Sequence, residues 1–378
     1  MQTNDPDYLF QTTSELSNAE RRERKLKAAE KVGDPIKVSS KVLDLLVDDQ
    51  LAWTAESGWQ ARKINLATTM LYKGHKGPVT SVQLFKVAGE TPWLALITSS
   101  WDKTVKIWDA AFTLQGHQDF VKSVTVLPTS PPTLLSTSSD KSCRLWDLSA
   151  LSSNEEPTTI QTIKDHTRPV DSAAYWIPEA GAQDNIIVWT SDSLGVIKRW
   201  NLIKAVGSTQ TPMKFVEDLN THDTSVGQLY PTEDGIWSVS MDKTARFHGD
   251  PSVVLKHPSY VKSLLAQPFG LPYILTGAED EEVRIWDAAN LQATKNQPIS
   301  IVSGHCGEVT AIVPWLKAEN GKSIPHVVTA GLDGTVRRWT IQELLHPPKL
   351  DYEPASQDSV ALTEEEEREL AELLSDDD

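Results

Sequence analysis

The middle of the chain consists of short apolar stretches separated by polar turns, and the same succession returns many times. A histidine is followed within a few residues by a valine that opens an alternation of apolar and polar residues, as in GHKGPVTSV and GHQDFVKSV. Alternation with a period of two is typical of β-strands. The pattern therefore predicts a protein built from many short strands. The histidines that lead these stretches are His75, His117, His166, His222, His257 and His305.

The units also end in a shared phrase. An apolar run leads into SSWDKTVKIWD, which begins at Ser99, and related stretches follow it along the chain. Five copies establish an internal repeat, and a repeat of this kind determines the fold before any single motif does. The copies span residues 99–109, 138–147, 239–249, 277–287 and 330–340.

With a histidine near the start of each unit and Trp-Asp near its end, residues 35–342 resemble the WD-repeat β-propeller family. The resemblance implies four-stranded antiparallel blades arranged in a ring. Ten residues before each closing position stands a Ser or Thr, and the same spacing between Thr54 and Ile64 identifies a degenerate first blade with Gly58 at the Asp position. We therefore expect an all-β, seven-bladed propeller. The blades are expected at about 42–66, 79–109, 121–147, 170–200, 226–249, 261–287 and 309–340.

The seventh blade ends after its third strand, so its outer strand must come from elsewhere. We expect residues 35–42, PIKVSSKV, to supply it, because this would join the two ends of the ring and cover open strand edges. The alternative donor, HPPKLDYEP after the last repeat, is too rich in proline for a paired strand.

A complete repeat contains four polar or aromatic residues, namely a His, a Ser or Thr, an Asp and a Trp. His, Ser and Asp can form a nucleophilic triad, but a catalytic site is needed once, whereas this set returns blade after blade. In the family the set forms a hydrogen-bonded chain from Trp through Ser or Thr and His to Asp, which satisfies buried polar groups. We therefore expect a structural role. The four sets are His75, Thr98, Asp102 and Trp108; His117, Ser136, Asp140 and Trp146; His257, Thr276, Asp280 and Trp286; and His305, Thr329, Asp333 and Trp339.

Other blades depart from this set. In the fourth, Leu194 stands at the Asp position and Asp192 comes two residues early, and in the fifth His248 and Gly249 replace the Trp and the following Asp. A buried polar group left unpaired costs about 1–3 kcal/mol. The first, fourth and fifth blades are therefore expected to be the least stable, and His248 is interpreted as a tolerated replacement.

In this family the turn that carries the Asp and the loop that carries the His lie at one end of the ring, the top. Side chains beside them are candidates to line the mouth of the central channel, and aromatic residues and Arg are frequent at binding hot spots. The alternative is that Trp101 and Phe120 only cover neighbouring loops. The candidate protein-binding residues form an aromatic and locally basic set: Trp101, Phe120, Lys122, Arg168, Met241, Tyr260 and Lys262.

Composition narrows the possible functions. The 378 residues carry a net charge of −16, and residues 351–378 alone hold 12 acidic residues and one basic residue. Proteins that bind nucleic acids usually show a basic stripe or patch, so no direct nucleic-acid ligand is expected. No apolar run approaches 18 residues and no signal-peptide layout is seen, which predicts a soluble protein of the cytoplasm or nucleus without a membrane partner. Because Cys143 and Cys306 lack metal-ligand spacing, neither a metal, a disulfide nor a cofactor is expected.

Residues 1–34 form a charged extension before the repeats. The segment Ser17–Val32 begins with a capping-box pattern, Ser17 with Glu20, and continues with helix formers, which predicts a solvated helix. Its RRERKLK cluster could alternatively be a nuclear localisation signal.

Residues 343–378 are expected to be a disordered acidic tail that contains a short amphipathic helix. The apolar side of that helix would carry Leu370, Leu373 and Leu374. Such a tail could bind a partner, keep the chain soluble or fold back onto the propeller as an autoinhibitor.

These features favour a non-catalytic scaffold or adaptor subunit of an intracellular complex, a monomeric propeller that binds protein or peptide ligands on its top face. Enzymatic activity is not expected because no unrepeated nucleophile, metal cluster or phosphate-binding loop occurs in the sequence, although some propellers are hydrolases. The alternative is an acidic escort or assembly chaperone for a basic client, such as a ribosomal protein or a histone.

Overall fold

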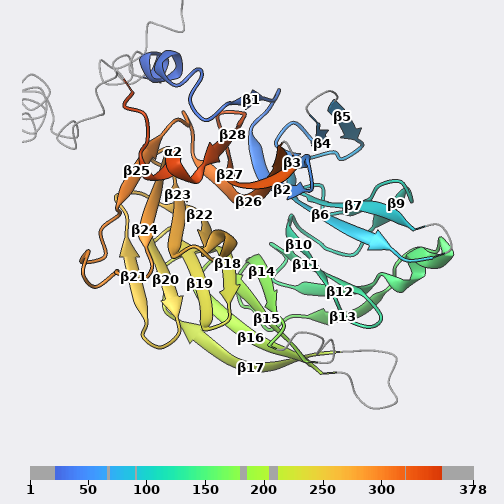
Figure 1. Cartoon of the computed structure of the whole chain (residues 1–378). Coiled ribbons are helices and arrows are strands. Elements are labelled where there is room, and N and C mark those ends of the chain that lie inside the picture. The colour runs from blue at the N-terminus through green and yellow to red at the C-terminus, as the bar shows by residue number, and fades with distance from the viewer. Residues whose placement is uncertain are drawn as a thin grey trace, which may run out of the picture. The chain divides into compact units, whose positions relative to one another are not determined.

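The computed structural model describes residues 22–65, 69–89, 92–178, 185–203, 212–319 and 321–350. Within the compact unit Lys31–Pro348, seven four-stranded antiparallel sheets follow one another around a central axis (Figure 1). The predicted all-β, seven-bladed propeller is confirmed.

The first six blades each use four consecutive strands, ordered from the axis outwards. Blade 1 has β2 (Val42–Asp48), β3 (Leu51–Glu56), β4 (Gln60–Ile64) and β5 (Thr69–Lys73); blade 2 has β6 (Val79–Val87), β7 (Trp93–Ser100), β8 (Val105–Ile107) and β9 (Phe112–Leu114); blade 3 has β10 (Val121–Leu127), β11 (Thr133–Ser138), β12 (Cys143–Asp147) and β13 (Thr159–Ile163). Blade 4 has β14 (Val170–Trp176), β15 (Asn185–Asp192), β16 (Val196–Ile203) and β17 (Met213–Asn220); blade 5 has β18 (Val226–Thr232), β19 (Gly235–Ser240), β20 (Thr244–His248) and β21 (Val253–Lys256); blade 6 has β22 (Val261–Ala266), β23 (Tyr273–Ala278), β24 (Glu282–Asp287) and β25 (Ser300–Ser303).

Blade 7 closes the ring with strands from both ends of the repeat region. It contains β26 (Val309–Glu319), β27 (Lys322–Gly331) and β28 (Thr335–Thr340), and its fourth strand is β1 (Ile36–Lys37). The predicted donor segment 35–42 is therefore correct, and β1 pairs antiparallel with β28. The backbone N–H of Val38 continues the contact by donating to the carbonyl oxygen of Gly334 at 2.8 Å.

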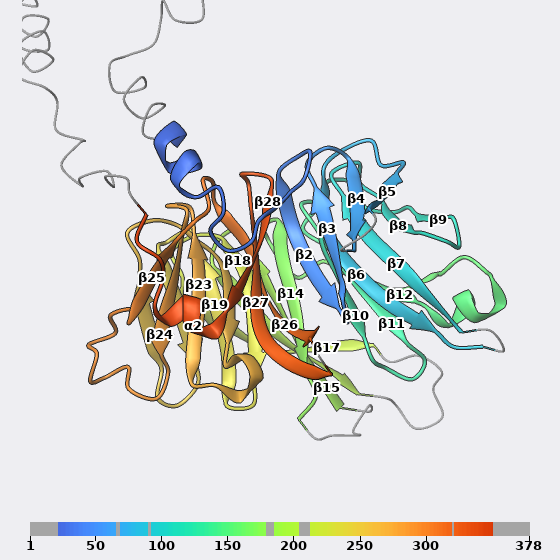
Figure 2. The same ribbon diagram turned by 45° about the horizontal axis from the view of Figure 1, so that its top comes forward.

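The long hairpin of β26 and β27 adds a second fastening between the first and last blades, and Figure 2 shows this hairpin beside β2. The indole N–H of Trp315 donates to the carbonyl oxygen of Asp49 at 2.8 Å, and the Gln50 side-chain amide donates to the carbonyl oxygen of Leu316 at 3.2 Å. These contacts join segments about 270 residues apart in the sequence, so they hold the ring closed only when the whole propeller has formed.

The core lies between adjacent blades. Ile107 of blade 2 and Leu134 and Trp146 of blade 3 belong to one buried cluster, and similar clusters fill the other interfaces between blades. Burying an apolar side chain of this size contributes roughly 1.5–3 kcal/mol. The valine that opens each innermost strand is also buried, which explains the valine-led alternation in the sequence: Val42, Val79, Val121, Val170, Val226, Val261 and Val309.

Five residues after β28 form the helix α2 (Ile341–Leu345), which begins with a capping box between Thr340 and Glu343. The second unit of the chain, Met1–Glu30 with Lys349–Asp378, is considered by itself. In it, residues 22–28 form a short helix with an ion pair of 3.0 Å between Lys27 and Glu23, so the predicted N-terminal helix is confirmed in this part.

Several predictions about the two ends of the chain lie outside the described residues. They are the capping-box residues Ser17 and Glu20, the disordered linker and the amphipathic tail helix with Leu370, Leu373 and Leu374. Among the described helices, none has the length and apolar character needed to cross a membrane.

Candidate functional site

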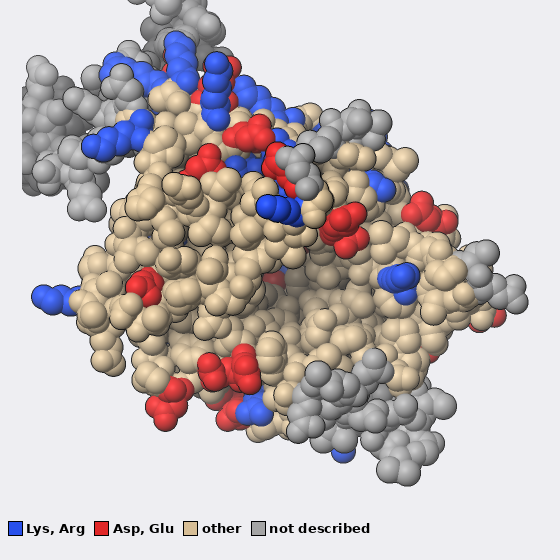
Figure 3. Space-filling model, viewed as in Figure 1, with Lys and Arg blue, Asp and Glu red and all other residues tan. Residues whose placement is uncertain are grey.

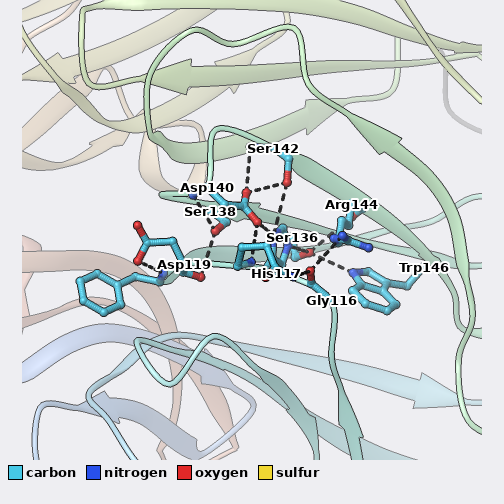
Figure 4. Close-up of polar contacts among 11 residues, drawn as sticks. Gly116, His117, Asp119, Ser136, Ser138, Asp140, Ser142, Arg144 and Trp146 are labelled. Carbon is cyan, nitrogen blue, oxygen red and sulfur yellow. Dashed lines mark hydrogen bonds and ion pairs between the residues drawn. The ribbon is translucent and has the colours of Figure 1, made fainter.

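The polar chain expected in each blade is complete in blade 3, where Figure 4 shows it. The indole N–H of Trp146 donates to the Ser136 hydroxyl at 2.9 Å, and His117 joins that hydroxyl through Nε2 (2.8 Å) to the Asp140 carboxylate through Nδ1 (2.9 Å). The Ser142 hydroxyl adds a bond of 2.6 Å to Asp140. Burial alone would raise the pKa of Asp140, but the bonds from His117 and Ser142 outweigh it and hold the pKa well below its ordinary value.

The same chain is complete in blades 2 and 7, as predicted. In blade 5, where we expected a gap, it is complete as well. His222 joins Ser238 at 2.6 Å to Asp242 at 2.7 Å, and Nε2 of His248 lies 2.7 Å from the Ser238 hydroxyl, in place of an indole N–H. The interpretation of His248 as a replacement for Trp agrees with this geometry, but the expectation that blade 5 lacks its polar chain is wrong.

Blade 4 also keeps its chain, which corrects the assignment of Leu194 to the Asp position. His166 lies 2.8 Å from the Thr190 hydroxyl and 2.9 Å from the carboxylate of Asp192. Asp192 stands two residues earlier than the other aspartates, yet its side chain accepts the backbone N–H groups of Leu194 and Val196 at 2.9 and 3.1 Å. The carboxylate therefore reaches the same histidine nitrogen from a different backbone position.

Blade 1 has a different polar cluster, built around the buried carboxylate of Glu56. Glu56 accepts hydrogen bonds from Thr54 (3.0 Å), Gln60 (2.8 Å), Ser40 (2.7 Å) and the guanidinium of Arg62. The ten-residue spacing correctly located Thr54 and the buried Ile64, but the carboxylate comes from Glu56 and not from the position of Gly58.

Blade 6 contains all four predicted residues, but one of the predicted bonds is missing. Trp286 and His257 bind the Thr276 hydroxyl at 2.9 and 2.8 Å. Asp280 instead faces Arg284, which donates two hydrogen bonds at 2.6 and 3.0 Å, and Nδ1 of the buried His257 has no hydrogen-bond partner among the described residues. The prediction of an intact chain in blade 6 is therefore wrong at its last step.

These chains fix the turn between the second and third strands against the start of the first strand. In blade 2 the backbone N–H of Trp101 donates to the carbonyl oxygen of Pro78 at 3.0 Å, and in blade 5 that of Met241 donates to Ser225 at 3.1 Å. Two short segments therefore lie side by side at the top of each blade. Corresponding bonds join Ser139 to Phe120, Ser193 to Pro169, Glu279 to Tyr260 and Leu332 to Glu308.

Each of blades 1–6 presents one large, exposed apolar side chain from these segments. Trp101 and Phe120, from neighbouring blades, stack with their ring centroids 5.0 Å apart and an angle of 18° between the rings. The two rings cover each other in part, and 42% of Trp101 and 39% of Phe120 remain exposed. The six side chains, which we call the top apolar set, are Trp59, Trp101, Phe120, Leu194, Met241 and Tyr260.

The residue after each opening valine forms a second ring, closer to the axis. Every innermost strand has a bulge there, so that this residue is skipped in the pairing with the second strand. A bulge bends the strand and redirects one side chain. The seven bulge residues are Leu43, Thr80, Lys122, Asp171, Gly227, Lys262 and Thr310.

The structure therefore brings the predicted site residues together on one end of the ring. Trp101, Phe120, Met241 and Tyr260 belong to the top apolar set, Lys122 and Lys262 are bulge residues, and the exposed Arg168 lies in the segment before β14. Their role in binding stays a prediction. Sequence reasoning missed Trp59 and Leu194, although both lie in the turn between second and third strands that supplied Trp101 and Met241.

The opposite end of the ring, seen in Figure 3, differs in its surface. Charged side chains lie mostly around its rim, and the middle, hollowed at the axis, is largely uncharged. Leu94, near the start of β7, and Phe269, in the turn between β22 and β23, lie at this end with partial exposure.

Other chemistry is scarce in the part of the chain that the structure describes. No group of three or more His, Cys, Asp or Glu residues in it could hold a metal ion. Cys143 and Cys306 are both buried, and burial raises the pKa of the Cys143 thiol, so this cysteine is not a reactive thiolate.

Comparison with known proteins agrees with the geometry of the blades. The family model of the WD domain, G-beta repeat, matches residues 66–109, 111–147 and 296–340. These matches end in blades 2, 3 and 7, which are the three blades with all four residues at the predicted positions and all bonds formed.

Relatives are found among curated proteins. A WD repeat-containing protein of Schizosaccharomyces pombe is 30% identical in an alignment of 402 positions that covers the full length of both chains. Two proteins named ribosome biogenesis protein WDR12 homolog are each 24% identical. The one from Chlamydomonas reinhardtii aligns with 68% of this chain and 62% of its own length, and the one from Trichoplax adhaerens with 71% and 64%.

Proposed function

Because the chain belongs to the WD-repeat proteins, whose propellers are typically non-catalytic interaction scaffolds, we propose that it is an adaptor subunit that docks a partner protein on the top of its ring. The observation that carries the proposal is the top apolar set, in which six consecutive blades each expose one large apolar side chain at the same end. Apolar side chains gathered on one face mark interaction sites, whereas singly scattered ones are normal.

The rigidity of this surface supports docking. The top segments are held by backbone bonds within each blade and by the polar chains below them, so the apolar side chains are presented in a fixed arrangement. A partner that binds such a surface loses little free energy to ordering of the loops. Aromatic anchors such as the Trp101–Phe120 pair are the side chains that most often dominate binding energy.

A second candidate function rests on the names of two relatives. Since both are named ribosome biogenesis proteins, a role in ribosome assembly in the nucleus is a more specific form of the proposal. An escort for a basic client protein would belong to the same class, with the acidic residues 351–378 as counter-charge. Salt-sensitive capture of basic proteins that disappears when residues 351–378 are deleted would support the escort.

The test of the adaptor proposal is affinity capture from native cells followed by mass spectrometry. The full chain is compared with Trp101→Ala/Tyr260→Ala, which removes two members of the top apolar set, and with Leu94→Ala/Phe269→Ala as a matched control at the opposite end. All three proteins should show the same thermal unfolding, because the substituted side chains are partly exposed. Loss of one set of partners in the first variant alone is expected. Retention of every partner in that variant, with loss in the control, would overturn the docking site.

A further inference from the structure

The bulge ring at the channel mouth is not symmetric in its chemistry. Thr80 and Thr310 use their hydroxyls within the ring, since they donate to the carbonyl oxygens of Val121 and Val42 at 2.7 and 2.9 Å. Leu43 has no polar atoms in its side chain. The bulge residues with charged side chains are Lys122, Asp171 and Lys262.

Asp171 belongs to blade 4, between the blades of the two lysines, and its carboxylate already has partners within the ring. Its carboxylate accepts a hydrogen bond of 2.7 Å from the Ser225 hydroxyl and lies 3.9 Å from the ammonium group of Lys122. The side chain is mostly buried, and this burial raises the pKa of Asp171 although both lysines oppose the shift. Asp171 therefore neutralises one of the two lysines at most.

The side chain of Lys262 lies beside Gly227 at the channel mouth. Gly227 occupies the bulge position of blade 5, between the blades of Asp171 and Lys262, and a Cβ there would lie 3.8 Å from both Cδ and Nζ of Lys262. The Lys262 side chain therefore extends over the bulge position of blade 5, at an ordinary contact distance. Lys262 is exposed, and none of the described carboxylates lies within ion-pair distance of it.

The surrounding surface has the same sign, although the chain as a whole is acidic. The surface around the mouth is formed by the three residues before each inner strand, the turns between second and third strands and the bulge positions. In these segments the exposed basic residues are Lys41, Lys76, Lys103, Lys141, Arg168, Lys243 and Lys262, and the exposed acidic residues are Asp223 and Glu279.

From this arrangement we propose that the channel mouth binds a carboxylate of the docked partner between Lys122 and Lys262. The ligand is an acidic peptide segment in which an Asp or Glu enters the mouth and a large apolar residue packs on the Trp101–Phe120 pair. Each lysine ammonium offers three donors, and a carboxylate accepts from such groups in short, charge-assisted hydrogen bonds. The inference rests on the proposed docking function and adds the chemistry of the partner.

The test uses the full-length chain as bait for a displayed library of short random peptides. Selected peptides should contain an acidic residue close to an aromatic or large aliphatic one. A peptide copy with that acid changed to its amide should bind the natural chain about ten-fold more weakly. The same change should make no difference to binding by Lys122→Gln/Lys262→Gln, so that the two losses are not additive.

A matched control is Lys214→Gln/Lys295→Gln, which changes the net charge equally at two exposed lysines in β17 and after β24. This variant should keep the ten-fold preference for the acid. Lys122→Arg/Lys262→Arg should keep it too, because it retains both positive charges.

The outcomes separate the two proposals. Selected peptides that lose binding in Trp101→Ala/Tyr260→Ala but show no preference for an acid would overturn the carboxylate site and leave the docking function standing. Peptides whose binding is unchanged by both sets of substitutions would count against the docking surface itself. So would a library that yields no peptide for this end of the ring.

Discussion

Blades 3 and 6 contain the same four residue types at the same spacing, yet their polar chains are connected differently. In blade 3, Asp140 binds His117, whereas in blade 6, Asp280 binds Arg284, and Nδ1 of His257 has no hydrogen-bond partner among the residues that the structure describes. The four residues alone therefore do not determine how the hydrogen bonds of a blade's polar chain are connected. The other donors to the carboxylate decide which way it turns.

Two donors present in blade 3 are absent from blade 6. Asp140 accepts the backbone N–H of Gln118 at 2.9 Å and the hydroxyl of Ser142 at 2.6 Å. At the corresponding positions blade 6 has Pro258, which has no N–H, and Glu282, which cannot donate when ionised. Blades 2, 5 and 7 keep a hydroxyl at the second position, in Thr104, Thr244 and Thr335.

The largest effect is expected from removal of the carboxylate itself. Asp140→Ala removes the partner of His117, Ser142 and a backbone N–H in a site that is 10% exposed, and should lower the free energy of unfolding by about 3 kcal/mol. Asp280→Ala should cost about half as much, because Asp280 is more exposed, at 23%, and has Arg284 as its main partner. Urea unfolding at pH 7 measures both, and equal losses would contradict the distinction between the blades.

As the pH falls, different blades should lose stability in different pH ranges. Burial, reinforced by the Arg284 guanidinium, lowers the pKa of His257 to about 4, and burial with its basic neighbours does the same for His248. Unfolded histidines take up a proton near pH 6.5 but these two do not while folded, so stability falls as the pH drops from about 6.5 to 4, by about 2–3 kcal/mol for each. The lowered pKa of Asp140 means that its contribution is lost only at pH values below about 3.8.

Urea unfolding of the natural chain and of His257→Gln at pH 7, 5.5 and 4.5 measures this dependence. The variant should lose about half of the slope between pH 6.5 and 4, since His248 remains. An unchanged slope would show that His257 does not carry it.

A smaller effect is expected at the hydroxyl position. Ser142→Ala removes the 2.6 Å bond to Asp140 and should cost about 1 kcal/mol. Glu282→Ala, at the same position in blade 6, loses a bond of 2.6 Å from Ser303 and should cost less than Ser142→Ala, because the Glu282 side chain is only partly buried. Thermal unfolding of the two variants side by side tests the contrast, which fails if Glu282→Ala is the more harmful.

Spacing in the sequence predicted the blades well because a β-strand converts residue number into position with little freedom. The Trp108 indole reaches the Thr98 hydroxyl, ten residues earlier, because the two residues lie on adjacent strands joined by one short turn. Thr54 and Ile64 lie on adjacent strands with the same spacing. Ring closure by β1 was also predictable, since the seventh blade lacks an outer strand and only one nearby segment can pair.

The connections of the carboxylates were not predictable from spacing in the same way. A side chain reaches a point in space from more than one backbone position, so Asp192 replaces a residue two places later and Glu56 replaces Gly58. Members of the top apolar set were predicted only where a large apolar residue stood directly before the repeated Asp or Val. Leu194 stands at the Asp position of an altered repeat, so nothing in the sequence indicated its exposure, which follows from the shape of the turn.

The smallest effect, and the sharpest test of the comparison, is expected from converting blade 6 to the pattern of blade 3. Pro258→Ala/Glu282→Thr supplies the missing N–H and hydroxyl, so Asp280 should turn from Arg284 toward Nδ1 of His257. Because one bidentate pair is exchanged for several single bonds, the net gain in stability should be below about 1 kcal/mol. The pKa of His257, followed by NMR, should rise above about 4 because a carboxylate now faces its ring. An unchanged pKa would show that the backbone of blade 6, and not these two donors, directs Asp280 to Arg284.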